Sequence, residues 1–416
     1  MPSTPLNIER LDLNLEADAS RVLLRGYGTS GPGHAKNAVE RILALSEEQV
    51  ESMWSATVAE FAHRHRDYQG AVLRNADSTG YPLPEDISPT RKALLGACLS
   101  MEYSLECAAL FNPSIVAHPD QSGLPDGSLR FVMSLRATGE GHVSSITFRT
   151  GVIDSQANVT LDEGRPHVEA PKLGGDADSG YTATFPADLP IAEQTLFPIT
   201  PSQSNGIEDA RFVQFEDGTY YGTYTAYDGR QIAPEMVETK DFTSYRFLPL
   251  RGTALRNKGL ALFPRKVGGR YTMLGRQDGE NNYLMQSDDL LEWNQTELLT
   301  TPKFDWEIVQ TGNCGSPMET EAGWLVLNHG VGPTRKYSIG VMLLDLEDPS
   351  KVIGRMETPL LSPNAEEREG YVPNVVYTCG AILHADYLII PYAISDSACR
   401  FARVRLADLL AHLTAP

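Results

Sequence analysis

From about residue 110 to residue 405, the chain repeats a β-rich pattern with a period of about 50 residues. In each unit, short apolar runs alternate with turns rich in Gly, Asp, Asn and Pro, and an aspartate follows an aromatic residue at a similar distance. This distance is 18 to 21 residues in three successive units: Tyr221 to Asp241, Tyr271 to Asp289, and Trp324 to Asp345. A period near 50 with about four strands per unit is typical of a β-propeller blade.

Five units of this kind fit the sequence, at about residues 111–165, 205–250, 258–305, 312–360 and 372–405. The sequence therefore predicts an all-β fold, a five-bladed β-propeller that spans residues 108–416. The alternative is a β-sandwich, but the strands of a sandwich would not carry the same landmarks at a fixed period. The acidic, turn-rich region at about residues 155–204 indicates an elaborated connection.

Residues 1–107 are predicted to form an N-terminal extension that is mainly helical. Ser46 and Gln49 make a capping-box pattern, and apolar residues follow them at helical spacing. Ser88 followed by Pro89 indicates the start of a second helix. The run LADLLAHL near the end of the sequence predicts a short terminal helix.

The composition limits the classes of partner and cofactor. The formal net charge of −19 disfavours binding to nucleic acids and to anionic membrane surfaces. The five cysteines form no CxxC pair and no residue cluster has metal-ligand spacing, so we expect no disulfide framework, no metal site and no cofactor. No apolar run approaches the ~20 residues of a spanning helix, and no signal-peptide pattern is present. These features predict a cytoplasmic protein, and they leave open whether it is a homo-oligomer.

The segment NGIEDAR places two adjacent carboxylates and an arginine, Glu208, Asp209 and Arg211, directly after a glycine turn. Because side chains alternate along a strand, we expect Glu208 and Asp209 to point to opposite faces, so that only one faces a given pocket. A carboxylate at a strand start with a nearby arginine is a candidate acid or orienting group. A solvated turn with a surface ion pair is the simpler interpretation of this spacing alone.

Ligands bind a propeller where the loops of all its blades converge, so polar residues outside the repeat pattern are candidates for the site. Taken singly, each has a simpler interpretation, such as an ion-paired arginine, a surface charge, a buried histidine or a solvated acidic loop. Their convergence from five units favours a shared site, and acids with arginines fit the cleavage of a glycosidic bond. The candidates are Asn112, Arg136, Glu208, Asp209, Arg211, Arg256, Asn257, Lys258, Arg276, Asp278, Gln310, Glu319, Glu321, His329, Glu366, Glu367, Glu369, Asn374 and Asp396.

The runs GIEDAR, NKGLALFP, GRYTMLGR, GWLVLNHGV and YVPNVVYTCG follow one another between about residues 108 and 405. Together they resemble glycoside hydrolase family 130, which comprises β-mannoside phosphorylases and β-mannosidases on a five-bladed propeller. The resemblance implies that residues 108–416 are the catalytic domain and that the substrate is a mannoside oligosaccharide. It also implies that Asp209 is the general acid of an inverting enzyme and acts through the 3-hydroxyl of the sugar. The residues that the resemblance assigns to mannosyl binding are Asn112, Arg136, Lys258 and Asp278.

The nucleophile decides between hydrolysis and phosphorolysis. The resemblance implies that phosphorylases of this family bind phosphate through arginines, a lysine and a histidine, which Arg256, Arg276 and His329 match in part. Gln310 stands at the lysine position, and Glu319 places a carboxylate nearby. A lost cation and a gained anion disfavour phosphate by about 1–4 kcal/mol per close charge pair.

An inverting hydrolase needs a carboxylate base that activates water, and Glu319 is the first candidate for it, followed by Glu367. This pattern predicts a β-mannosidase acting on β-1,2-linked manno-oligosaccharides, with Asn257 and Asn374 contributing to substrate binding. The alternative is a β-mannoside phosphorylase, with inorganic phosphate as co-substrate and mannose 1-phosphate as product. A non-catalytic carbohydrate-binding propeller is disfavoured because Asp209, the acid position, is present.

Overall fold

The computed structural model describes residues 6–27, 32–78, 80–176 and 180–415. Contacts divide the chain into two compact units. The smaller unit comprises Asp18–Cys107 with Arg165–Ala170, and the larger one comprises the residues up to Ala17, Ala108–Gly164 and the chain from Pro171 onward.

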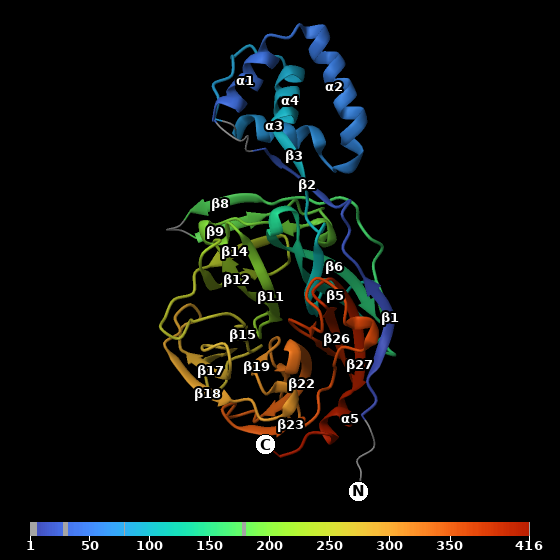
Figure 1. Ribbon diagram of the computed structural model, residues 1–416, viewed down its shortest axis with the longest axis vertical. Coiled ribbons are helices and arrows are strands. Elements are labelled where there is room, and N and C mark those ends of the chain that lie inside the picture. Colours follow the sequence, from blue (N-terminus) through green and yellow to red (C-terminus); the bar gives the residue numbers. More distant parts are fainter. Residues whose placement is uncertain (1–5, 28–31, 79, 177–179, 416) are drawn as a thin grey trace. The chain divides into compact units, whose positions relative to one another are not determined.

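Antiparallel strands dominate the larger unit (Figure 1), and in its described residues they form five successive meanders. The first meander is β4 (Ala109–Ala117), β5 (Leu129–Thr138), β6 (Ser144–Ile153) and β7 (Val159–Leu161). The second is β11 (Gly206–Gln214), β12 (Tyr220–Tyr227), β13 (Ile232–Thr239) and β14 (Ser244–Leu248). The third is β15 (Ala261–Leu262), β16 (Tyr271–Gly275), β17 (Asn282–Ser287) and β18 (Gln295–Thr300).

The last two meanders follow the same plan. The fourth is β19 (Gln310–Asn313), β20 (Met318–Thr320), β21 (Gly323–Gly332), β22 (Lys336–Leu344) and β23 (Val352–Arg355). The fifth is β24 (Val376–Tyr377), β25 (Ile382–His384), β26 (Tyr387–Ile394) and β27 (Ala398–Arg405). The five meanders therefore lie within the five units expected from the repeat, to within a few residues at each end.

Buried apolar side chains fill the contacts between consecutive meanders, and the first meander also packs against the fifth. Representative pairs within these shared clusters, from the first–second contact to the fifth–first contact, are Phe148 and Phe212, Met236 and Met285, Phe263 and Trp324, Ile339 and Ile390, and Phe401 and Phe131. Strand β4 accordingly contacts both β11 and β26. Each meander thus buries both of its faces, which explains why its strands read as nearly continuous apolar runs.

The aspartates that mark the repeat close turns. The side chain of Asp241 accepts hydrogen bonds from the backbone N–H groups of Thr243 and Ser244 at 2.8 and 3.2 Å. Asp289 accepts one from Leu291 at 2.8 Å, in the turn that follows β17. An aspartate that bonds to the backbone two residues on favours a tight turn, so this landmark recurs because the meanders share a turn.

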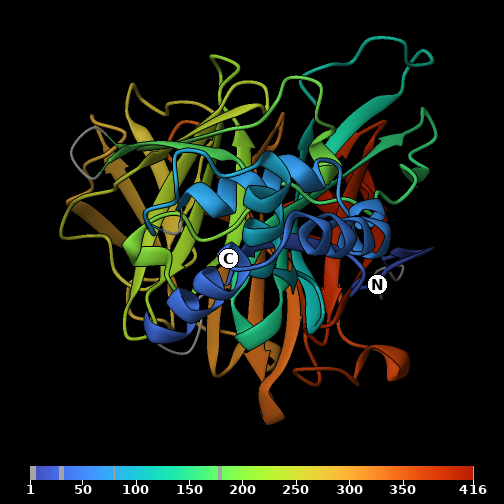
Figure 2. The ribbon, with the colours of Figure 1, turned by 90° about the horizontal axis from the view of Figure 1, so that it is seen from above.

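The smaller unit contains the helices α1 (Pro32–Leu43), α2 (Glu47–Phe61), α3 (Tyr68–Ser78) and α4 (Pro89–Cys98), and a hairpin of β2 (Val22–Gly26) and β3 (Ser100–Ser104). Helix α4 contacts the other three helices (Figures 1 and 2). The capping box of Ser46 and Gln49 and the cap by Ser88 are confirmed. Sequence analysis did not predict helices α1 and α3, although Asp67 caps α3 by accepting a hydrogen bond from Gly70 N–H at 2.9 Å. None of the helices in the described ranges is long and apolar enough to span a membrane.

The N-terminal strand differs from the expected domain boundary at residue 107. Strand β1 (Glu9–Leu15) pairs with β27 and adds an outer strand to the fifth meander. A strand can pair with any open sheet edge, however distant in sequence, so the boundary was not readable from local pattern. After β27 the chain forms α5 (Leu406–Ala411), the expected terminal helix.

The expected connection between the first two meanders also contains strands. Strand β9 (Gly180–Thr184) pairs with β14 and with β8 (Lys172–Asp176), and so extends the second meander. Strand β10 (Thr195–Leu196) pairs with β6 of the first meander. This connection is therefore partly built into the sheets.

Candidate active site

Two irregular strands hold the residues at the centre of the candidate site. In β11, the pairing with β12 shifts between Glu208 and Arg211, and Asp209 takes a left-handed conformation with φ 53°. In β4, the pairing with β5 shifts between Phe111 and Ser114, and Asn112 has φ 51°. Asn and Asp tolerate this region better than most residues. The two bulges turn both side chains toward each other, and the amide of Asn112 donates to Oδ1 of Asp209 at 2.7 Å.

Arg136 on β5 binds both carboxylates of the GIEDAR segment. Its Nη2 donates to Glu208 at 2.8 Å, and its Nη1 donates to Asp209 at 3.3 Å. The expectation that Glu208 and Asp209 face opposite sides is therefore wrong. The β11 bulge interrupts the alternation of side chains, as bulges do. Ser144, through Oγ at 2.9 Å, accepts a hydrogen bond from Arg136 Nε and fixes the guanidinium.

The charges around Asp209 favour its ionised form. Burial alone would raise the pKa of this carboxyl, but Arg136, Lys258 and Arg211 outweigh burial and hold the pKa well below the ordinary value. Glu208 differs: burial raises its pKa, and the charge of Asp209 adds to this in spite of Arg136. Two adjacent carboxyls thus have pKa values shifted in opposite directions, which is a common feature of functional sites.

Arg211 connects three meanders beneath Asp209. It is buried, and it donates to the backbone oxygens of Asp209 and Cys314 and to the hydroxyl of Tyr377, at 2.7, 2.6 and 2.9 Å. These hydrogen bonds come from one rigid fork, so they fix the Asp209 backbone relative to the fourth and fifth meanders.

Lys258 and Asp396 complete the charges near Asp209. The charge of the Lys258 ammonium lowers the pKa values of the Asp209 and Asp396 carboxyls and of the His329 ring. Burial and the charge of Asp209 raise the pKa of Asp396 to about 6. Asp396 lies in the turn between β26 and β27 with φ 50°. Sequence analysis included it among the candidates of the fifth unit but assigned it no role.

A second buried cluster contains Arg276 and His329. Arg276 Nη1 donates to His329 Nε2 at 2.7 Å, which requires a neutral ring with its proton on Nδ1, because arginine only donates. Burial lowers the pKa of His329 well below its ordinary value, and the charges of Arg276 and Arg211 lower it further. The ring also stacks on Tyr337, with 5.7 Å between centroids. The amide of Gln310 lies 3.4 Å from the hydroxyl of Tyr337, so Gln310 borders this cluster.

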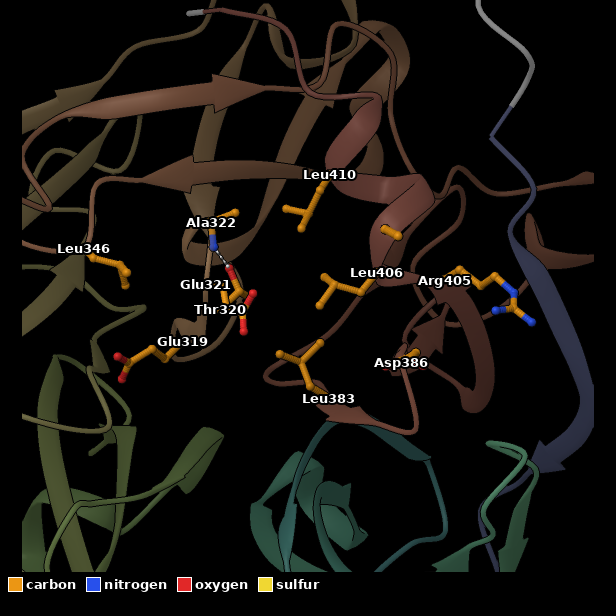
Figure 3. A pocket seen from close by; sticks show the side chains of 11 residues that line it. Glu319, Thr320, Glu321, Ala322, Leu346, Leu383, Asp386, Arg405, Leu406 and Leu410 are labelled. Carbon is orange, nitrogen blue, oxygen red and sulfur yellow. Dashed lines mark hydrogen bonds between the residues drawn. The ribbon is translucent and has the colours of Figure 1, made fainter. Parts of the chain in front are cut away.

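Glu319 lies away from Asp209, so its predicted role as the base does not agree with the structure. Its carboxylate is exposed and forms a two-pronged ion pair with Arg265, with both N–O distances 2.7 Å. It lines a pocket together with Phe212 and Val213, which lie about 10–13 Å along β11 from Asp209. Glu319 also lines a cavity of about 980 Å³, together with Leu383 and Leu406 (Figure 3). The error arose because Glu319 follows β19 closely in sequence but lies at the opposite end of the strands.

Glu367, the second predicted base, is fully buried and already paired. Arg10 Nε and Tyr392 Oη donate to its Oε1 at 3.1 and 2.7 Å. Although burial raises its pKa, these hydrogen bonds lower the pKa below the ordinary value. Its other oxygen accepts from the backbone N–H of Asn364 at 3.1 Å. A carboxylate engaged in this way is a structural anchor, and the structure does not place it against Asp209.

The remaining predicted residues lie on loops. Asp278 is exposed, and hydrogen bonds from its own turn and from Tyr283 lower its pKa to about 2 against the effect of burial. Asn257 has φ 61°, and its amide packs against Gly279, in the turn that also contains Asp278. Arg256 is exposed. Asn374 has φ 65° and accepts a hydrogen bond from Arg368 at 2.8 Å. The structure shows no contact between these four residues and Asp209 in the part of the chain that it describes.

The site thus combines an ionised carboxylate, its arginine and amide partners, a lysine and a buried arginine–histidine pair. Among residues 6–27, 32–78, 80–176 and 180–415, no group of three or more His, Cys, Asp or Glu side chains could hold a metal ion. Such a site can bind a polar, partly anionic ligand and move a proton at Asp209.

Residues 189–414 match the sequence profile of glycoside hydrolase family 130, described as β-1,4-mannooligosaccharide phosphorylase. The chain is 34% identical over 217 residues to a 1,2-β-oligomannan phosphorylase of Thermoanaerobacter sp. (strain X514), which covers 50% of this chain and 72% of that protein. The chain belongs to glycoside hydrolase family 130. It is also 33% identical over 227 residues to a β-1,2-mannobiose phosphorylase of Listeria innocua serovar 6a, which covers 52% of this chain and 63% of that protein.

Solved structures of family 130 are also similar to this chain in fold. The Listeria innocua β-1,2-mannobiose phosphorylase, solved with β-1,2-mannobiose, has a TM-score of 0.54 at 22% identity and covers 74% of this chain and 92% of its own. Another structure, with a TM-score of 0.55 at 18% identity, comes from work on family 130 glycoside hydrolases that target β-1,2-mannosidic linkages in Candida mannan, and covers 73% and 86%. Asn112 and Arg136 precede the region matched by the family profile, yet the structure brings both to Asp209.

Proposed function

We propose that this protein is a phosphorylase of β-1,2-linked mannosides, which forms mannose 1-phosphate from a manno-oligosaccharide and inorganic phosphate. The observation that carries the proposal is the position of Glu319. The sequence suggested that the Glu319 carboxylate would repel a bound phosphate. In the structure this carboxylate pairs with Arg265 instead of facing Asp209. Lys258, Arg276 and the neutral His329 then form one side of the site, and neither predicted base, Glu319 or Glu367, lies against it. The curated relatives, which are phosphorylases of β-1,2-oligomannan and β-1,2-mannobiose, support the same reaction.

The five meanders are inferred to be the blades of one closed five-bladed propeller. Each consecutive pair shares an apolar cluster, and the first and fifth meanders share one as well. Sheets that pack face to face in a ring in this way leave only short edges. The bulged first strands of the first two meanders, β4 and β11, then meet at Asp209, which suits a ligand site at one end of the central axis.

Asp209 is proposed as the general acid. Phosphate attacks the anomeric carbon as the bond from this carbon to the leaving oxygen breaks. The proton of Asp209 passes through the 3-hydroxyl of the mannosyl unit to that oxygen, and the product is α-mannose 1-phosphate with inverted configuration. Asn112 and Arg136 hold the carboxyl, and Oδ1 of Asn112 has no hydrogen-bond partner in the described part of the chain and is free for a sugar hydroxyl.

Phosphate binding is proposed to give Asp209 its proton. In the free site, Arg136, Lys258 and Arg211 hold the pKa of Asp209 low, so the carboxyl is ionised. A bound phosphate adds negative charge beside Lys258 and opposes that effect, which raises the pKa of the acid. The acid would therefore be protonated only when the nucleophile is in place, a useful order for excluding hydrolysis.

Hydrolysis is the second candidate, and Gln310 is the observation that favours it. An amide stands where the phosphorylases of the family have a lysine, and its side chain contacts Tyr337 beside His329. The missing cation would weaken phosphate binding, but Lys258 and Arg276 remain on that side of the site. The base that hydrolysis needs is not supplied by Glu319 or Glu367 in their observed positions.

Initial-rate kinetics with varied phosphate tests the anion site. Arg276→Gln removes a charged partner, and hydrogen bonds to charged groups contribute about 1.5–3 kcal/mol. We expect the KM for phosphate to rise about tenfold to a hundredfold, with a smaller change in the KM for β-1,2-mannobiose. Equal changes in both KM values would place phosphate elsewhere.

A further inference from the structure

The N-terminal strand contacts the loop that precedes the fifth meander. Arg10 on β1 donates through Nε and Nη2 to the two carboxylate oxygens of Glu367, at 3.1 and 3.3 Å. The same Nη2 donates to the backbone oxygen of Ser362 at 2.8 Å. Arg10 and Glu367 are 357 residues apart in sequence, and Arg10 precedes the region that matches the family. Nothing in the proposed chemistry uses this pair.

Glu367 in turn fixes both ends of a short helical turn. Asn364 caps the turn, and its backbone N–H donates to Glu367 at 3.1 Å. The backbone oxygen of Glu367 accepts a hydrogen bond from Ser395 Oγ at 2.8 Å. Tyr392 donates to the carboxylate from β26 at 2.7 Å. Glu367 therefore joins the 364–374 loop to β26 through its buried carboxylate, and to the turn that carries Asp396 through its backbone oxygen.

The two structures that Glu367 holds carry Asp396, which lies near Asp209, and Asn374, which the sequence predicts to bind substrate. The 364–374 loop ends at Asn374, whose backbone conformation is left-handed with φ 65°. The turn after Ser395 places Asp396 within the field of Asp209, Arg136 and Lys258. The loop and the turn also bond to each other, because Val372 N–H donates to the Ser395 oxygen and Ser395 N–H donates to the Val375 oxygen, at 2.9 and 2.8 Å.

We propose that Arg10 is a positioning residue of the active site, which acts through Glu367 to fix the 364–374 loop and the turn that carries Asp396. Without Arg10, the buried Glu367 carboxylate loses its two-pronged partner and keeps only the more distant Arg400, at 3.7 Å, and a buried anion with weakened pairing is unfavourable. The carboxylate must then move toward water, and the loop moves with it. The consequence for catalysis rests on the proposed function, whereas the consequence for the loop does not.

Glu9 provides a matched control. It is the neighbour of Arg10 on β1, and it forms an ion pair with Arg403 on β27 at 2.8 Å. Successive side chains of a strand point to opposite faces, so Glu9 lies on the other side of β1 from Glu367. Glu9→Ala therefore removes a β1 ion pair, to Arg403 on β27, without touching the loop.

The experiment compares wild type, Arg10→Ala, Arg10→Lys, Tyr392→Phe and Glu9→Ala in two measurements. The first is hydrogen exchange of peptides covering residues 363–375, followed by mass spectrometry. The second is steady-state kinetics with β-1,2-mannobiose and phosphate varied in turn, at a temperature where each variant is folded.

We expect Arg10→Ala to speed exchange in residues 363–375 and to lower kcat/KM for mannobiose about tenfold to a hundredfold, the scale of a small misplacement of binding groups. The KM for phosphate should change less than kcat/KM for mannobiose, because this loop reaches His329 only indirectly, through the hydrogen bond from Tyr337 N–H to the Asn374 oxygen and the stacking of Tyr337 on the ring. Arg10→Lys should recover part of the loss, and Glu9→Ala should match wild type in both measurements.

Several outcomes would overturn the proposal. Arg10→Ala could match Glu9→Ala in exchange and kinetics, or it could raise both KM values equally, as a general loss of folding would. If Arg10→Ala does not fold, Arg10→Lys and Tyr392→Phe must still speed exchange in residues 363–375, and unchanged exchange in both refutes the proposal. A wild type without phosphorolysis would defeat the proposed function, while the exchange measurement would still decide the role of Arg10.

Discussion

Arg276 donates a hydrogen bond to Nε2 of His329 across 2.7 Å, and both side chains are buried. The pair keeps the imidazole neutral and the guanidinium charged in the same small space. Nε of Arg276 has no hydrogen-bond partner in the described part of the chain. A buried arginine with an unused donor, held by a neutral base, is well suited to a ligand oxygen that carries negative charge.

Gly312→Ala should disrupt this pair. Gly312 lies opposite His329 on the paired strands β19 and β21, and a Cβ at this position would collide with Arg276 Cδ and His329 Cε1. We expect kcat/KM for phosphate to fall about tenfold to a hundredfold. Gly164→Ala is the control, because no atom lies within 4 Å of a Cβ there. Wild-type phosphate kinetics in Gly312→Ala would show that the pair does not serve the anion.

Asp209→Asn should abolish turnover and leave folding and mannoside binding nearly intact. Asparagine keeps the hydrogen-bonding shape of the side chain at Asn112 and Arg136 but cannot deliver a proton, and general acid catalysis is typically worth ~10²–10⁴-fold. Calorimetric titration with β-1,2-mannobiose and assays of kcat check the two halves of this prediction. Activity within about threefold of wild type would move the acid role to another residue.

Glu319→Gln should leave kcat within about twofold of wild type, whereas a catalytic base would cost several orders of magnitude. The substitution breaks an exposed ion pair with Arg265, and such pairs contribute ~0.2–1 kcal/mol to stability. Arg265→Gln breaks the same pair from its other side and should behave alike. A large loss of rate in Glu319→Gln alone would restore the carboxylate to the mechanism.

Asp396→Asn should stabilise the protein in a pH-dependent way. Burial and the charge of Asp209 raise the pKa of Asp396 to about 6 from the ordinary 3.8, so the folded state holds a proton that the unfolded state releases between these values. Wild-type stability therefore falls as pH rises through this window and stays lower above it. We expect a higher Tm for Asp396→Asn at pH 7.5, worth at most about 3 kcal/mol, and no difference below about pH 4. A gain that is equal at both pH values would contradict this origin.

Much of the fold could be predicted from sequence because the meanders repeat the same turn and the same apolar burial. Asp241 and Asp289 recur because each closes the turn after a long strand. Contacts between segments that are distant in the chain produce no such repeating pattern in the sequence. The pairing of β1 with β27 and the bond between Arg10 and Glu367 join residues that no local pattern connects.

The site could be predicted only where a motif fixed the chemistry. Asp209, Asn112, Arg136 and the Arg276–His329 pair are brought together in the two clusters described above. Glu319 was misplaced because residue type and spacing do not say at which end of a strand a side chain lies. Glu208 was misplaced because the bulge at Asp209 reverses the alternation that a regular strand would have.

Product analysis with β-1,2-mannobiose, with and without inorganic phosphate, tests the central proposal most directly. We expect mannose 1-phosphate and free mannose in equal amounts when phosphate is present, with the α configuration at the phosphorylated carbon. Without phosphate, we expect almost no turnover, because neither predicted base, Glu319 or Glu367, faces Asp209. Release of two mannose molecules per mannobiose, at a rate that does not depend on phosphate, would contradict the proposal and establish a hydrolase.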